Sequence, residues 1–133
     1  MSKPIDVPVG LHPTDTLRLV ARIEALKVGS DPNAPELFYD RTGLRISLEG
    51  WQELVMQDNY RTLASSTVHK DLVSTIWLGV SHGERDGKPL LFETMVFHKR
   101  KTNAPIRCVR YVTEQEAIRG HEQMCAEHAR RQA

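Results

Sequence analysis

One carboxylate lies inside an apolar segment in the second half of the chain. Glu93 interrupts the run from 90 to 97, Leu-Leu-Phe-Glu-Thr-Met-Val-Phe, which predicts a strand with little exposure to water on either face. A dry and unpaired ionised carboxylate would cost several kcal/mol, so Glu93 must be paired, used or neutralised. The expected partner is Arg110 or Arg107 on a neighbouring strand. We also expect other large side chains close to this pair: Trp77, Tyr111 and His121.

Two interpretations of this pair follow. The one that we prefer is a structural ion pair that fixes the register of the strands. The alternative is a small polar pocket under the C-terminal helix, in which Glu93, Arg110 and His121 bind a small molecule or nucleotide, or act as a modest hydrolase. A filled centre around Glu93 would favour a binding protein, whereas an open pocket with shifted acid or base groups would favour an enzyme.

Zinc chemistry is the second possibility that the residue types raise. His121, Cys125 and His128 recur at i, i+4 and i+7 on a predicted helix, and imidazole and thiolate are good zinc ligands. Structural zinc takes four ligands, however, and usually draws paired cysteines from a tight turn. Small Cys and amphipathic His side chains on the inner side of a helix are ordinary packing. We therefore predict no metal.

No other spacing in the chain matches a reactive constellation. The nucleophile and base candidates are generic, and no serine lies in an elbow motif. The glycines at 79, 83 and 87 are too widely spaced, with no following helix, to cradle a phosphate. A Rossmann or P-loop nucleotide enzyme is excluded, no cofactor is expected, and the balance favours a protein without catalytic activity.

A basic segment follows the apolar strand. It runs from His98 to Arg107 and contains Lys99, Arg100 and Lys101, which could engage phosphates or an acidic protein surface. No aromatic stacking set accompanies these cations, so an acidic protein partner is favoured over nucleic acid. We predict that Lys99, Arg100 and Lys101 form the partner-binding surface.

Composition bounds the class of protein. A chain of 133 residues with 40% apolar content fits one globular domain. The formal net charge is +1, so no global field draws the protein to nucleic acid or an anionic membrane. Two isolated cysteines and the lack of a leader-like start favour a reducing, intracellular location. The apolar runs are far shorter than the ~20 residues of a membrane span, so we expect a soluble protein.

The elements that position these residues fall into two parts. Residues 1–36 are expected to be an N-terminal extension, with an amphipathic helix over 14–28 and a Pro-rich linker over 30–35. Residues 37–133 are expected to be a single domain. Thr113 and Glu116 form a capping box that starts a long helix ending near residue 130. Before it we predict a hairpin over 37–46, a short helix after Ser47, a second hairpin over 60–80, and strands over 89–98 and 106–112.

These elements predict an α+β fold. Its antiparallel sheet has about four main strands, and the long C-terminal helix packs on one face. Short N-terminal helices and a small hairpin complete the domain. The segments 72–80 and 89–98 are apolar on both sides, so they should form the middle of the sheet.

A resemblance rests on several blocks that occur in order between about residues 38 and 124. They are Tyr39-Asp40-Arg41-x-Gly43, Trp51, Tyr60-Arg61, Val73-Ser-Thr-Ile-Trp-Leu-Gly79, Phe92-Glu-Thr-Met-Val-Phe97, Arg110-Tyr111-x-Thr113 and Glu116-Ala117-x-x-Gly120-His121-x-x-Met124. The chain resembles an uncharacterised protein family common in bacteriophages, especially those of actinobacteria. The resemblance implies no particular activity. The chain departs from that pattern in its N-terminal helix and in the basic loop from His98 to Lys101, where a specialised role would lie.

The functional hypothesis is a non-catalytic, phage-encoded binding or inhibitor protein that occupies a host macromolecule, such as a component of host defence. The lack of a reactive constellation and the phage resemblance both favour it. We expect a host protein as partner, no membrane, and a location in the host cytoplasm. The sequence leaves the oligomeric state open, a dimer included.

Overall fold

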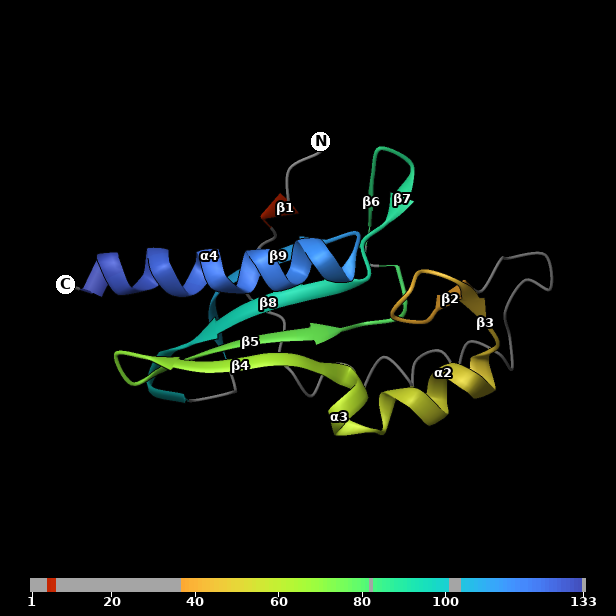
Figure 1. The fold of residues 1–133 in the computed structure, drawn as a ribbon, viewed down its shortest axis with the longest axis horizontal. Helices are drawn as coiled ribbons and strands as arrows, with labels where there is room; N and C mark the ends of the chain where they lie inside the picture. Colours follow the sequence, from red (N-terminus) through yellow and green to blue (C-terminus); the bar gives the residue numbers. More distant parts are fainter. Residues whose placement is uncertain (1–4, 7–36, 82, 101–103, 133) are drawn as a thin grey trace.

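A five-stranded antiparallel sheet lies at the centre of the protein (Figure 1). The computed structural model describes residues 5–6, 37–81, 83–100 and 104–132. In spatial order the strands are β1 (Ile5–Asp6), β9 (Pro105–Tyr111), β8 (Phe92–Phe97), β5 (Asp71–Trp77) and β4 (Thr62–Val68). The four main strands predicted from the sequence are therefore present, with β5 and β8 in the interior of the sheet. Two residues of the N-terminal extension form β1 beside β9, whereas the predicted helix over 14–28 and the linker lie outside the described residues.

The long helix α4 (Glu114–Gln132) lies across one face of the sheet, as predicted (Figure 1). The Thr113 hydroxyl accepts a hydrogen bond from the Glu116 backbone N–H at 3.1 Å, so the cap forms where the sequence places it. Gly120 allows a close approach, because a Cβ there would overlap the ring of Tyr111. The buried side of α4 consists of Ala117, Gly120, His121, Met124 and His128.

The buried side of α4 is narrower than the sequence pattern predicts. Cys125 is half-buried, although we expected it on the inner side of the helix, and Ile118 is 43% exposed. His121 lies on the side of α4 that faces β4, where it contacts Ser66. Ile118 and Cys125 lie on the same side of the helix as His121, but farther from the centre of its buried face. Because β4 is the last strand of the described sheet, little strand surface is left to cover them.

Smaller elements close the ends of the sheet. The predicted first hairpin forms from β2 (Phe38–Tyr39) and β3 (Arg45–Ile46), and Ser47 caps α2 (Leu48–Val55). A single-turn helix, α3 (Asp58–Arg61), and the hairpin of β6 (Glu84–Arg85) and β7 (Lys88–Pro89) were not predicted. The β6–β7 hairpin extends away from the sheet in Figure 1. The short element η1 (His98–Arg100) follows β8 at the other end of the sheet.

Apolar side chains bury both faces of the sheet, as the two-sided patterns of β5 and β8 predict. The face under α4, together with α2, holds the larger cluster, which includes Trp51, Trp77, Phe92, Val96 and Tyr111. The opposite face holds a second cluster: Ile76, Leu78, Met95, Phe97 and Cys108. Candidate site residues on opposite faces of the sheet are therefore separated by the sheet itself.

Candidate functional site

Glu93 forms a buried ion pair with Arg110. The two residues lie directly opposite each other on β8 and β9, and Arg110 Nε donates to Glu93 Oε2 at 2.9 Å. Their side chains are 3% and 11% exposed. Arg110 is thus one of the two partners that the sequence suggested. The pair links two adjacent strands in one register, which is the role of a structural ion pair.

The alternative interpretation, a pocket formed by Glu93, Arg110 and His121, is wrong. Neighbouring residues of a strand point to opposite faces, and Thr94 points toward α4, where it lies in one hydrogen-bonded network with His121. Glu93 therefore points to the face that α4 does not cover. The sheet separates the Glu93 carboxylate from the His121 imidazole, so the two groups cannot act on one substrate.

The other residues expected near Glu93 are also placed elsewhere. Trp77 lies across from Phe92, and its indole N–H donates to the Tyr39 carbonyl at 3.1 Å. Tyr111 packs against Gly120 of α4. Arg107 does not reach Glu93 but forms an ion pair with Glu127 of α4 at 2.7 Å. The hydrogen bond from Arg107 lowers the pKa of the Glu127 carboxyl below its ordinary value.

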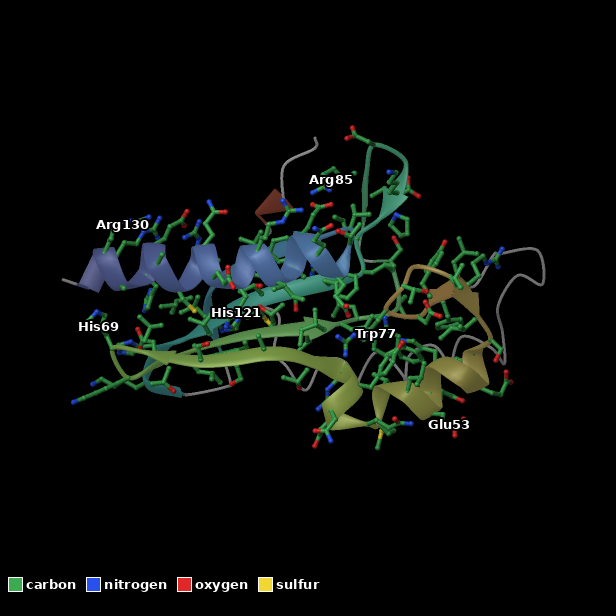
Figure 2. The ribbon with its side chains drawn as sticks, in the orientation of Figure 1. Glu53, His69, Trp77, Arg85, His121 and Arg130 are labelled. Carbon is green, nitrogen blue, oxygen red and sulfur yellow. The ribbon has the colours of Figure 1, made fainter. Side chains whose placement is uncertain are left out.

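His121 lies in a polar network between α4 and the sheet (Figure 2). Its Nε2 is 2.8 Å from the Ser66 hydroxyl and its Nδ1 is 2.7 Å from the Thr75 hydroxyl, which is 2.5 Å from that of Thr94. Burial lowers the pKa of His121, which favours the neutral ring with one donor and one acceptor nitrogen. Ser66 and His121 resemble a nucleophile and base, but a threonine hydroxyl cannot stabilise an imidazolium as a carboxylate does. We interpret the network as the polar contact that positions α4.

The zinc alternative has no support from the arrangement of these side chains. His128 Nε2 lies 2.7 Å from Asp71 Oδ2, whereas both ring nitrogens of His121 contact hydroxyls. Within the described ranges, no group of three or more His, Cys, Asp and Glu side chains is placed to hold a metal ion.

Asp71 joins three elements at one end of the sheet. It begins β5 and its side chain is 3% exposed. Its carboxylate accepts a hydrogen bond from the Lys99 backbone N–H at 2.6 Å and contacts His128 at 2.7 Å and His98 at 3.2 Å. The bond from Lys99 is the main cause that lowers the pKa of Asp71. Lys99 has a φ of 50°, an uncommon conformation for a residue with a side chain. Asp71 therefore joins η1 to β5 and to α4.

Basic side chains surround the buried carboxylate of Asp71. We call the group the basic end and define it as His69, Lys70, His98, Lys99, Arg130 and Arg131, all of them exposed. It combines the β4–β5 turn, η1 and the last turn of α4, and Figure 2 shows His69 and Arg130 at the same end of the molecule. Of the predicted partner-binding residues, Lys99 belongs to it. The side chain of Arg100 and all of Lys101 lie outside the described part of the chain.

A cavity that the sequence did not predict lies at the other end of α4. It measures about 490 Å³ and is lined by three separate segments, from the β2–β3 turn, β7 to β8, and the start of α4. The lining residues are Tyr39, Arg41, Thr42, Gly43, Lys88, Pro89, Leu91, Val112, Thr113, Glu114 and Gln115. None of the predicted site residues lines it. No local pattern brings these three segments together, so only the tertiary fold defines the cavity.

Comparisons with models of known families, with curated proteins and with solved structures give no match for this chain. The resemblance to a phage family therefore stays a prediction. No helix in the described part of the chain is long and apolar enough to cross a membrane. The described residues define an α+β domain with one helix across an antiparallel sheet.

Proposed function

We propose that this chain is a non-catalytic binding protein, encoded by a bacteriophage, that acts by occupying an acidic surface of a host protein. The observation that carries the proposal is the basic end. Six basic side chains are exposed there, while the Asp71 carboxylate is buried beneath them and paired. An exposed patch of one sign attracts a partner of the opposite sign and speeds their encounter.

The interactions of the candidate reactive residues support binding over catalysis. Glu93 is buried in an ion pair on one face of the sheet, and His121 is hydrogen-bonded to hydroxyls on the other. General acid–base or nucleophilic catalysis requires such groups within reach of one reacting atom. Each of these residues instead has a structural partner.

The composition of the basic end favours a protein partner over single-stranded nucleic acid. No Phe, Tyr or Trp occurs in the described segments that form it, 69–71, 98–100 and 128–131. Proteins that bind single strands combine cations with aromatic rings on which bases stack. The net charge of +1 also shows that the positive field is local.

The proposal predicts that Lys70→Asn/Lys99→Asn reduces capture of the partner from an actinobacterial lysate. Asparagine removes the charge and tolerates the left-handed backbone at both positions, where φ is 73° and 50°. Exposed charges contribute little to stability, so the melting temperature should remain nearly unchanged. Immobilised wild type and variant can be compared by quantitative mass spectrometry of the captured proteins.

A matched control removes two exposed charges elsewhere. Arg45→Gln/Arg119→Gln alters β3 and the outer side of α4, away from the basic end. This control should capture the partner as well as wild type does. Equal loss in the control and in the Lys70→Asn/Lys99→Asn variant, or no loss in either, would contradict the role of the basic end.

A further inference from the structure

The cavity at the start of α4 has an apolar floor. Leu91 is 2% exposed and Val112 is 9% exposed, while Pro89 is half-buried at the side. The ring of Tyr39 adds an aromatic wall from the first hairpin. A volume of about 490 Å³ falls in the range of sites for small organic ligands, roughly 300–1,000 Å³. The floor suits a flat apolar group.

Some polar groups of the cavity wall already have partners. Arg41 forms an ion pair with Glu114 and donates to the Tyr60 carbonyl at 3.1 Å. The Thr42 hydroxyl donates to Asp40 at 2.6 Å, and the Thr113 hydroxyl caps α4. The Arg41–Glu114 pair joins the first hairpin to the start of the helix. The wall is thereby held in place without a ligand, which reduces the entropic cost of binding one.

Three lining side chains have no partner among the described residues: the Lys88 ammonium, the Gln115 amide and the Tyr39 hydroxyl. The charges of Arg41 and Glu114 offset each other, so Lys88 leaves the lining with one net positive charge. Glu114 and Gln115 are also the first residues of α4, where backbone N–H groups lack partners within the helix. The electrostatics therefore favour a negatively charged group beside Lys88.

We propose that this cavity binds a small organic anion, with a flat apolar or aromatic body on Leu91 and Val112 and a carboxylate or phosphate group at Lys88. The cavity and its unpartnered cation define the site, and the helix start adds to its positive potential. This site is separate from the basic end, because the two lie at opposite ends of α4. The inference is independent of the proposed function.

The test is a titration of the full chain with benzoate, phenyl phosphate and benzyl alcohol. Binding is detected by changes in the amide chemical shifts in NMR spectra. Both anions should shift the amides of Gly43, Thr113 and Gln115 at millimolar concentration. Benzyl alcohol has the same ring without the charge, and should bind about tenfold more weakly. A preference for benzoate or for phenyl phosphate shows whether the site favours a carboxylate or a phosphate group.

Two variants separate the roles of charge and of the cavity. Lys88→Gln should weaken both anions about tenfold and leave benzyl alcohol unchanged, whereas Lys70→Gln at the basic end should change nothing. Gln115→Trp should obstruct the cavity and abolish binding of all three compounds. The proposal is overturned if none of the compounds shifts the cavity amides, if the shifts lie at the basic end, or if Lys88→Gln has no effect.

Discussion

Arg110→Met is expected to lower the free energy of unfolding by about 3–5 kcal/mol, because it leaves the Glu93 carboxylate buried without its cation. The Glu93 side chain is only 3% exposed, so the carboxylate would have little contact with water in place of the lost partner. Urea denaturation followed by circular dichroism measures the change.

Two further variants make this result specific. Glu93→Met/Arg110→Met should be more stable than Arg110→Met alone, because removing both charges leaves no unpaired ion in the sheet. Arg107→Met breaks a pair with Glu127 in which both side chains are 27% exposed, and should cost about 1 kcal/mol or less. If Arg110→Met cost no more than Arg107→Met, Glu93 would have to be hydrated, and the structural interpretation of the pair would fail.

Asp71→Asn should destabilise the protein by about 2–4 kcal/mol at neutral pH. The substitution weakens charge-assisted hydrogen bonds that join β5 to η1 and to α4. Because the pKa of Asp71 is lowered on folding, its ionised form stabilises the native state. This contribution is fully present above the unfolded value of 3.8 and is lost as pH falls through the folded value.

The pH dependence provides the check. The difference in unfolding free energy between wild type and Asp71→Asn should be present above pH 3.8 and should shrink as the pH falls below that value. Asp58→Asn is the matched control, because its side chain is 84% exposed in a pair with Arg61 and should change stability by a few tenths of a kcal/mol. If the difference in unfolding free energy between wild type and Asp71→Asn stayed constant into strong acid, it would contradict the role of Asp71 as an ionised acceptor.

Local signals predicted much of the fold. The capping box at Thr113 located the start of α4, and two-sided apolar patterns identified β5 and β8 as interior strands. Such patterns depend on neighbours in the chain, which a sequence displays directly. The single-turn helix α3 and the two-residue strands β6 and β7 are too short to give a periodic signal.

The candidate site was predicted only in part. Alternation groups Glu93 with Met95 on β8 and Arg110 with Cys108 on β9. It reveals neither the register that pairs the two strands nor the face that α4 covers. His121 was therefore assigned to the wrong group. Asp71 was not among the predicted site residues, because its burial comes from η1 and the end of α4, which are distant in the chain. The cavity likewise depends on three separate segments.

The salt dependence of the dissociation constant tests the binding account most directly. It can be measured for the captured partner by surface plasmon resonance over a series of sodium chloride concentrations. Wild type and Arg45→Gln/Arg119→Gln should lose affinity steeply as salt rises, because opposite charges at the interface are screened. Lys70→Asn/Lys99→Asn should bind more weakly, associate more slowly and respond less to salt. Equal affinity and equal salt dependence for all three proteins would contradict the account.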